Sequence, residues 1–436
     1  MTTTADAALT NAGAVRDAVR AFLDENFDRD ISLRTWLSRL VDSGWASPQW
    51  STDWFGKGLS ADLAAVAFDE FRKVKAPGPP AGLGRMLAAP TIIAHGSDEQ
   101  KQQFVRRILT GEDAWCQLFS EPGAGSDLAS LQTRAELDGD EYVVNGQKVW
   151  TSGALGADLG MLLARTDVDV PKHRGISYFA FEMDQPGVEV RPLKQITGDA
   201  SFAEVFFTDA RVPAANVIGE LNGGWGTAMT TLMNERVGLG AGAGLNFPIS
   251  APAGRKIQDQ LEVSVGDYID KVSGGRSAQA GSAGRNMGLG ALVAYAKKNG
   301  RDKDPGVRDQ IARAYTLNQL LAWNGLRAKA AAKAGKGLGP EASLGKLMMS
   351  HVTRQNRETA LAIVAGDAML AGKDGPLGGS VASQVLFTPA PSIYGGSDQV
   401  QRNIIGERVL GLPKDPDISR DVPFRDLKVG TQSKAN

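Results

Sequence analysis

The spacing of apolar residues changes twice along this chain of 436 residues, and this change limits the folds that it can adopt. Apolar side chains recur at helical spacing in residues 1–116, whereas residues 117–226 contain short apolar runs that are bounded by turns and are typical of strands. Helical spacing returns in residues 227–436. We therefore predict an α+β fold in which a compact β domain lies between a helical N-terminal domain and a helical C-terminal domain.

The helical units carry local signals that locate individual helices. Val15, Val19 and Leu23 fall on one helical face, and Ser97 followed by Gln100 forms a capping box that predicts the start of a helix. Further helical patterns follow the β domain and suffice for a four-helix bundle. These patterns are AMTTLMNERVGLGAG, VRDQIARAYTLNQLLAWNGL, KLMMSHVTRQNRETALAIV and QVQRNIIGERVL.

Residues 247–306 interrupt the C-terminal helical patterns. This stretch is rich in Gly, Ser and Lys, and its apolar periodicity is weak. We predict that it is a loop or a mobile insertion that contains short helices at most.

The charge and the metal-ligating residues exclude several classes of function. With 48 Lys and Arg against 49 Asp and Glu, the net charge is −1, so no overall positive field favours nucleic acid. Cys116 is the single cysteine, which excludes an intramolecular disulfide, and we predict a small buried apolar side chain there. Because His95, His173 and His351 are far apart in the sequence, no metal site is predicted.

Targeting and membrane signals are also missing from the sequence. The N-terminal residues lack a basic segment followed by an apolar run, so no secretory signal is predicted. No apolar run approaches the roughly 20 residues that span a bilayer. We expect a soluble, cytoplasmic protein.

Two motifs bear on other classes of enzyme. No GxSxG elbow occurs, so nothing local favours a serine hydrolase. GLGAGAG at 238–244 is similar to a phosphate-binding loop, but it follows no strand and lies in a helical pattern, which favours tight helix packing. A nicotinamide-dependent enzyme stays open as an alternative.

Two blocks of sequence predict a ligand site in the β domain. FSEPGAGSDLAS at 119–130 is a turn-rich loop whose small residues allow a flat ligand to approach the backbone. EYVVNGQKVWTSG at 141–153 predicts a β-hairpin with Asn145 and Gly146 at its turn, followed by an indole and two hydroxyls that suit an aromatic, polar ligand.

Together these two blocks resemble the flavin site of the acyl-CoA dehydrogenase family. The resemblance extends over roughly residues 15–413, and its other motifs are VRPLKQITG, EVFFTDARVPAANVIGE and RNIIGERVLGLP. The family fold has an N-terminal helical domain, a middle β domain and a C-terminal four-helix bundle, which agrees with the α–β–α order of the chain.

The resemblance implies FAD as the cofactor. By this resemblance Trp150 and Ser152 would flank the isoalloxazine ring, and Ser126 would also lie near the thioester arm of the substrate. An ordinary core indole is the alternative role for Trp150. The other residues that would border the flavin are Gln117, Phe119, Ser120, Gly125 and Ser126.

The resemblance also implies the reaction, which removes one hydrogen each from Cα and Cβ of an acyl thioester. A carboxylate takes the α-proton, and the enolate that develops is stabilised at its carbonyl oxygen. Many members carry this carboxylate in a Tyr-Glu-Gly-Thr loop, where this chain has Gly395. The amide N–H of Gly395 would still serve as a clamp for the thioester carbonyl.

A subset of the family carries the base elsewhere, as a Glu followed by Arg on the helix before the bundle. Glu235 and Arg236 match this position, so we predict that Glu235 is the α-proton base. Arg236 would orient the site or face the coenzyme A arm, or else form an ion pair on the helix surface. Asp398 is a rival base, although its position matches a family residue without that duty.

The ADP half of the flavin site departs from the common family pattern as well. The Arg that usually precedes a Phe-Gly pair has no clean match, and only Lys297, Lys298 and Arg301 are candidates for it. Ser397 and Gln399 match family flavin contacts better. Some relatives with composite flavin sites are heterotetramers, so a homo-oligomer or a heterotetramer is expected.

We expect an acyl-CoA dehydrogenase that forms trans-2-enoyl-CoA and passes electrons to an electron-transferring flavoprotein. An acyl-CoA oxidase and a catalytically silent subunit of a heteromeric dehydrogenase stay open as alternatives. The position of the predicted base favours a branched, long or polycyclic acyl group.

Overall fold

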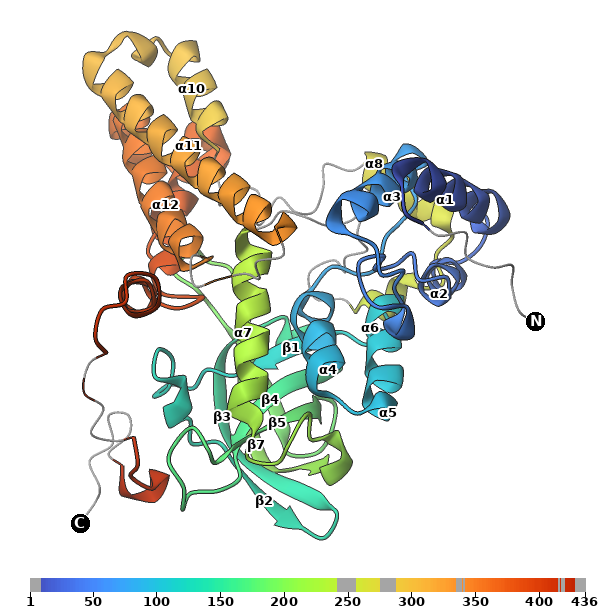
Figure 1. The fold of residues 1–436 in the computed structure, drawn as a ribbon. Coiled ribbons are helices and arrows are strands. Elements are labelled where there is room, and N and C mark those ends of the chain that lie inside the picture. Colours follow the sequence, from blue (N-terminus) through green and yellow to red (C-terminus); the bar gives the residue numbers. More distant parts are fainter. Residues whose placement is uncertain are drawn as a thin grey trace.

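The computed structural model describes most of the chain (Figure 1). The described residues are 9–240, 256–274, 288–334, 339, 342–414, 416 and 420–427, and only the backbone is described for 236–240, 274, 332, 333 and 342.

The N-terminal domain is a cluster of helices whose apolar faces meet in one core. Val15, Val19 and Leu23 are buried as predicted, and Ser97 forms the predicted capping box with Gln100. The helices are α1 (Ala12–Asn26), α2 (Leu33–Asp42), α3 (Ala61–Lys73), α4 (Ala89–His95), α5 (Asp98–Gln100) and α6 (Arg106–Thr110), with π-helical turns η2 (Gly84–Ala88) before α4 and η3 (Lys101–Val105) before α6.

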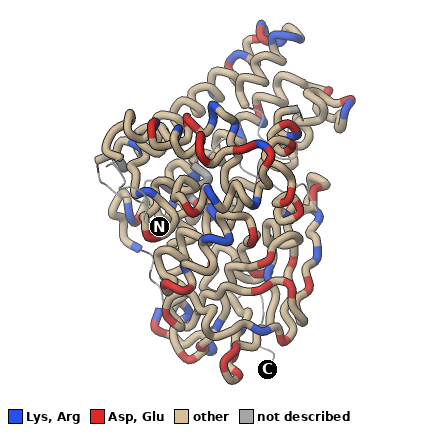
Figure 2. Tube along the Cα trace, turned by 90° about the vertical axis from the view of Figure 1, so that its right-hand side faces the viewer, with Lys and Arg blue, Asp and Glu red and all other residues tan. Residues whose placement is uncertain are grey.

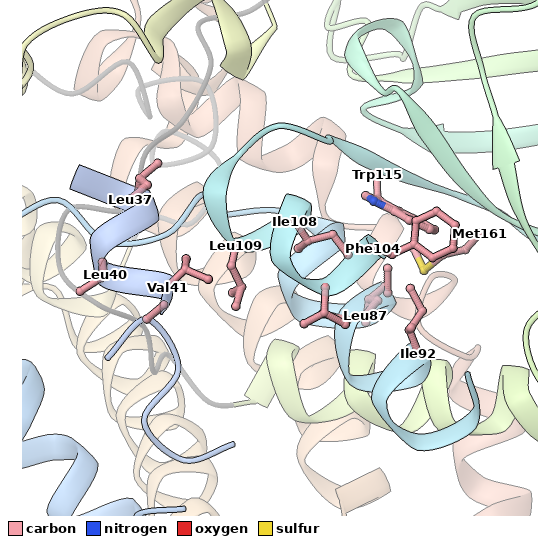
Figure 3. Packing of buried hydrophobic residues seen from close by; sticks show 14 of the residues in the cluster. Leu37, Leu40, Val41, Leu87, Ile92, Phe104, Ile108, Leu109, Trp115 and Met161 are labelled. Atoms are coloured by element: carbon pink, nitrogen blue, oxygen red, sulfur yellow. The ribbon is translucent and has the colours of Figure 1, made fainter. Parts of the chain in front are cut away.

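This helical core continues into the β domain without a break. Figure 3 shows apolar side chains that follow one another from Leu40 of α2 through Leu109 and Phe104 to Trp115 and Met161 in the sheet. The Phe104 and Trp115 rings meet edge to face with centroids 5.5 Å apart. The N-terminal and β domains therefore share buried surface.

The middle domain is a seven-stranded sheet in the order β1-β4-β2-β3-β7-β6, with β5 paired to β4. The five apolar runs that predicted strands, EYVV, GMLLAR, ISYFAFEM, GVEVRPL and AEVFF, lie in five of the seven strands, and WCQL and RAELD form the other two. The strands are β1 (Trp115–Leu118), β2 (Arg134–Asp138), β3 (Glu141–Ser152), β4 (Leu159–Arg165), β5 (Ile176–Glu182), β6 (Val188–Leu193) and β7 (Phe202–Pro213).

The hairpin predicted at Asn145 and Gly146 is wrong. Both residues lie inside the continuous strand β3, and the turn that joins β2 to β3 falls at Gly139 instead. Gly146 has a φ of 153° at a break in the β3–β7 register, and a Cβ there would lie 2.5 Å from Thr133 Oγ1. Asn145 accepts a hydrogen bond from Asp209 N across the strands (3.0 Å). The Asn-Gly pair therefore forms a β-bulge, which needs the same backbone freedom as a turn.

The C-terminal helices surround a smaller core of their own. Leu292, Val307, Ala360 and Ile363 are buried in it, and Figure 1 shows α10, α11 and α12 side by side. The helices are α7 (Gly224–Gly240), α10 (Leu289–Lys298), α11 (Pro305–Lys333), α12 (Ala342–Val364), α13 (Ser380–Phe387) and α14 (Asp398–Ile404).

The stretch 247–306, predicted to be a loop or mobile insertion with short helices, is described only in part. Its helix α8 (Val265–Gly274) packs into the N-terminal core through Tyr268 and Ile269, and Leu33 N donates to Val263 O (2.9 Å). Residues 247–255 and 275–287 lie outside the described residues, as does the end of the glycine run 238–244.

A segment near the C-terminus returns to the β domain. Phe424 N donates to Val170 O (2.9 Å) and Arg425 N donates to Val168 O (3.0 Å), so residues 420–427 lie along the β4–β5 loop. No helix among the described residues is long and apolar enough to cross a membrane. Figure 2 shows basic and acidic residues interspersed along the trace, in keeping with the net charge of −1.

Candidate active site

The loop 119–131 is folded onto itself by Glu121. The backbone of Glu121 exchanges two hydrogen bonds with Ala124 (2.9 and 3.1 Å), which closes a tight turn. Its buried carboxylate accepts hydrogen bonds from Gln132 N (2.7 Å) and Thr133 N (2.9 Å). The loop is therefore shaped by one internal carboxylate rather than by apolar packing alone.

Lys148 of β3 neutralises this carboxylate. Its fully buried Nζ donates to Glu121 Oε1 (2.8 Å) and to Phe119 O (3.0 Å). Burial raises the pKa of Glu121, but the charge and hydrogen bond of Lys148 outweigh it and hold that pKa below its ordinary value. Since Val149 N also donates to Ser120 O (2.9 Å), the loop is fixed to β3 at successive residues.

Arg165 supports the far end of the same loop. Its buried guanidinium donates to Ala129 O (2.7 Å) and Leu131 O (3.3 Å). The Cζ atom of Arg165 lies 3.7 Å from the centroid of the Phe424 ring. Burial lowers the pKa of Arg165 to about 10. The C-terminal segment therefore takes part in holding the loop.

The accessible face of this site consists of small residues and one indole. Gly125 and Ser126 are exposed, and a Cβ on Gly125 would meet nothing within 4 Å. The Trp150 side chain is 57% exposed, so the alternative of a core indole is wrong. Trp150 has a φ of 62°, a strained value for a bulky residue, and its ring meets the Phe202 ring edge-on with centroids 5.8 Å apart.

These residues fit a flat aromatic cofactor. An exposed indole held in a strained conformation offers a π surface to a ligand, and Ser152 lies half-buried beside it on β3. The open space at Gly125 lets a ligand approach the backbone amides of the loop.

A buried polar chain joins the loop to helix α7. The Phe119 and Tyr178 rings meet edge to face (5.9 Å), and Tyr178 OH hydrogen-bonds to Thr231 Oγ1 of α7 (3.3 Å). Thr231 Oγ1 also hydrogen-bonds to Thr91 Oγ1 of α4 (2.9 Å). Glu235 follows Thr231 by one helical turn, on the same face of α7.

Buried Lys346 of α12 donates hydrogen bonds to the loop 391–397 and interacts electrostatically with Glu235. Its Nζ donates to Pro391 O (2.6 Å) and Gly396 O (3.1 Å), and its side chain is 4% exposed. Burial lowers the pKa of Lys346, while the charges of Asp398 and Glu235 oppose this shift. The ammonium therefore bonds to the loop that contains Gly395, the predicted carbonyl clamp, and interacts electrostatically with Glu235.

The glycines of this loop adopt a backbone that other residues avoid. Gly395 has a φ of 62° and Gly396 a φ of 84°, and Gln401 Nε2 donates to Gly395 O (2.9 Å). A Cβ on Gly396 would lie 2.5 Å from Gln401 Nε2. The loop is thus held at its carbonyl oxygens by Lys346 and Gln401.

Comparison with known proteins identifies the family of this chain. Consecutive parts of the chain match the acyl-CoA dehydrogenase N-terminal domain (residues 11–112), middle domain (116–210) and C-terminal domain (274–410). Acyl-CoA dehydrogenase IpdE1 of Mycobacterium tuberculosis is 37% identical over 388 residues, which are 88% of this chain and 88% of that protein. The chain belongs to the acyl-CoA dehydrogenase family. It is accordingly an oxidoreductase.

Solved structures of acyl-CoA dehydrogenases share the fold. The Tcur3481-Tcur3483 steroid ACAD is 26% identical with a TM-score of 0.67, and the match covers 95% of this chain and 100% of that chain. The ChsE4-ChsE5 complex from Mycobacterium tuberculosis is 27% identical with a TM-score of 0.61, over 95% of this chain and 100% of that chain.

Within this acyl-CoA dehydrogenase fold, the rival base Asp398 is already engaged. It is 5% exposed, and Arg354 donates to its Oδ2 (2.7 Å). Burial raises the pKa of Asp398, but hydrogen bonding by Ser350 and the charge of Arg354 hold it below its ordinary value. A carboxylate that is paired in this way is a weak proton acceptor.

The remaining predicted residues lie apart from this centre. Gln117 is half-buried in β1, the Ser397 hydroxyl accepts from Val400 N as the cap of α14 (3.3 Å), and Gln399 is exposed. The Arg236 side chain lies outside what the structure describes. No described hydrogen bond joins Ser397 or Gln399 to residues 117–152, so these contacts stay predictions.

The candidates for the ADP half are also peripheral. Arg301 donates to Ala362 O (3.1 Å) and pairs with Asp304 (3.4 Å), which fixes a turn between helices α10 and α11. Lys297 and Lys298 close the last turn of α10. Nothing in the described chain brings them to Trp150 or Glu235.

The sequence reasoning missed Lys148 and Lys346. Each is a cation at a position that the fold buries completely or nearly so. The available signal was a lysine inside an otherwise apolar stretch, as in KLMM and KVW. A buried lysine requires acceptors, and here they come from residues distant in the sequence.

Proposed function

We propose that this chain catalyses FAD-dependent α,β-dehydrogenation of an acyl-CoA thioester to the trans-2-enoyl-CoA. The observation that carries this proposal is the link through Lys346, whose ammonium touches the Gly395–Gly396 loop and acts electrostatically on Glu235. One buried ammonium thus fixes the loop of the proposed carbonyl clamp and interacts electrostatically with the proposed proton acceptor. This is the pair of groups that α-proton abstraction from a thioester requires.

The residues that would hold FAD are those of the accessible face and its support. Trp150 and Ser152 offer a π surface and a hydroxyl, and Gly125 and Ser126 leave the loop amides open. The rest of the proposed set is Gln117, Phe119, Ser120, Ser397 and Gln399. Bound FAD supplies the acceptor for the hydrogen that leaves Cβ.

Glu235 acts as the base that takes the α-proton. Its side chain is half-buried, so the carboxylate is partly shielded from water. The Gly395 N–H stabilises the negative charge that develops on the thioester oxygen. Arg236 and Ser126 are assigned to the coenzyme A arm and the thioester.

Relatives support a bulky substrate and a second subunit. One similar structure is described as a steroid ACAD, and two similar structures contain pairs of different proteins. We propose that this chain acts on a bulky acyl group within a homo- or heterotetramer and passes electrons to an electron-transferring flavoprotein. A silent subunit is the second candidate, because the ADP-side arginine of the common pattern has no match.

The substitution Glu235→Gln tests the proposal. It should lower turnover by roughly two to four orders of magnitude, the contribution of a general base, and leave the visible flavin absorption intact. Glu220→Gln, at an exposed glutamate outside the site, is the matched control and should keep full turnover. Undiminished turnover in Glu235→Gln would remove that residue from the mechanism. Absence of flavin from the purified chain alone would favour the silent subunit.

A further inference from the structure

Arg85 is a cation of the N-terminal domain for which the described part of the chain offers no partner. It lies in the π-helical turn η2, which packs against α7. Among the described residues nothing accepts a hydrogen bond or ion pair from its guanidinium. Other arginines of the same domain behave differently, since Arg106 pairs with Asp42 (3.0 Å) and Arg107 with Asp113 (2.6 Å).

Arg85 is largely enclosed by protein but still accessible. Burial lowers the pKa of its guanidinium, so protein surrounds most of the charge. The residue nevertheless keeps accessible surface, so the protein does not close over it. The guanidinium is therefore desolvated and yet can be reached by a ligand.

The contacts of α4 show where Arg85 lies along α7. Gln100, just after α4, donates to Val217 O ahead of α7 (2.8 Å), whereas Thr91 hydrogen-bonds to Thr231 inside α7 (2.9 Å). The two helices therefore run in opposite directions. Since η2 precedes α4, it lies beside the part of α7 that follows Thr231.

The helical rise places Arg85 near the level of the proposed base. Arg85 precedes Thr91 by six residues (91 − 85), or about 9 Å, and Glu235 follows Thr231 by four (235 − 231), or about 6 Å. Because α4 and α7 are antiparallel, Arg85 and Glu235 both lie on the same side of the Thr91–Thr231 contact along the helix axes. An acyl chain whose Cα meets Glu235 therefore has η2 on one side of it.

An unpaired guanidinium in such a place is unfavourable unless a ligand supplies the acceptor. Its planar fork fits a carboxylate bidentately and a ketone oxygen singly. The sequence that follows Glu235 contains no Asp or Glu before Asp259, so the chain offers no acidic partner from that stretch.

We infer that Arg85 selects acyl groups that carry an acceptor oxygen remote from the thioester, a carboxylate or a ketone. This inference rests on the proposed dehydrogenase function. Arg85 is the specificity-determining residue, and its planar fork replaces the water that such an oxygen loses on binding.

Matched substrates test this inference on the full chain. Octanoyl-CoA, its keto analogue with the carbonyl next to the terminal carbon, and suberyl-CoA differ only at the far end of the acyl chain. We expect kcat/KM to favour the oxygenated substrates by about tenfold or more, as for a hydrogen bond to a charged group. A greater gain for suberyl-CoA assigns the site to carboxylates, and a greater gain for the keto analogue assigns it to ketones.

The substitution Arg85→Met should remove this preference and leave kcat/KM for octanoyl-CoA unchanged or higher. Arg85→Lys keeps the charge without the fork and should retain part of the preference. Arg106→Met, at a paired arginine of the same domain, is the control and should keep all of it. Calorimetric titration with the same three thioesters reads the preference independently of turnover.

The two proposals fail in distinguishable ways. Oxidation of octanoyl-CoA with no preference for either oxygenated substrate, or an unchanged preference in Arg85→Met, overturns the role of Arg85 alone. Lack of both turnover and binding with every acyl-CoA overturns the dehydrogenase function and this inference with it.

Discussion

The two loops of the candidate site are held in contrasting ways. Loop 119–131 contains its own carboxylate, Glu121, and buried Lys148 neutralises it at 2.8 Å. Loop 391–397 contains no acidic residue, and buried Lys346 donates only to its carbonyl oxygens. The positive charge of Lys346 is therefore directed outside its loop, toward Glu235 and Asp398.

This difference separates a structural ion pair from an electrostatic influence on catalysis. Where a buried cation is paired with a buried anion, as Lys148 is with Glu121, the two charges stabilise the conformation of the loop. Their fields largely cancel at the position of a ligand. Where a buried cation meets only dipoles, the rest of its field acts on the nearest carboxylates. Substitutions at the two lysines should therefore produce different kinds of defect.

The largest expected effect follows from Lys148→Met. The substitution leaves Glu121 buried without its counter-ion, which should lower the free energy of unfolding by about 3–5 kcal/mol. Chemical denaturation of the purified chain measures this loss. Restoring part of the stability by adding Glu121→Gln would confirm that the unpaired charge is the cause.

An exposed ion pair provides the control for that experiment. Arg191 and Glu189 pair at 2.7 Å with more than half of each side chain exposed. Arg191→Met should leave the free energy of unfolding nearly unchanged, because solvent screens an exposed pair. An equally small change in Lys148→Met would contradict the structural role assigned to the buried pair.

The next largest effect is expected for Lys346→Met, which should change the dependence of kcat/KM on pH. Loss of a nearby positive charge raises the pKa of a carboxylate, so the acidic limb of kcat/KM should move to higher pH by about one unit. Ser350→Ala removes another donor to Pro391 O (2.8 Å) without a change in charge. An equal shift in Ser350→Ala would show that loop position, and not charge, sets the profile.

A smaller effect on stability is expected at Trp150. Trp150→Gly relieves the positive φ and loses the edge contact with Phe202, so the unfolding free energy of the flavin-free chain should change by about 1 kcal/mol or less. Flavin content per chain should fall, because the exposed π surface is gone. Full flavin content in Trp150→Gly would exclude the indole from the cofactor site.

The smallest effect should be seen at Cys116, in the strand that leads into loop 119–131. Burial raises the pKa of its thiol to about 12, and its sulfur lies 3.8 Å from Met183 Sδ. The folded protein should therefore be inert to a disulfide reagent near neutral pH and should react once it is unfolded. Rapid reaction of the folded chain would show that β1 opens.

Local sequence predicted the order of the elements because periodicity reports which side of each element is buried. It failed at Asn145 and Gly146, since a turn and a bulge need the same backbone freedom. Only β7, whose Asp209 bonds to Asn145, distinguishes them. That partner is distant in the sequence, so local chemistry does not reveal it.

The candidate site could be proposed from sequence where a motif keeps its chemistry in one stretch, as at Gly125 and Trp150, whose contacts with the cofactor stay predictions. It was not predictable where one side chain serves several segments. Lys346 reaches carbonyl oxygens of residues 391 and 396, and Arg165 reaches those of 129 and 131. Carbonyl acceptors leave no mark on the identity of a residue, so these supports appear only in the folded chain.

The stacking of Phe424 on Arg165 has a consequence for the order of events during synthesis. Loop 119–131 leaves the ribosome long before residues 420–427, yet those residues complete the packing of the arginine beneath it. A nascent chain therefore presents this loop with one of its supports missing. Capture of the cofactor should be weaker on the nascent chain than after residues 420–427 have been released and have docked.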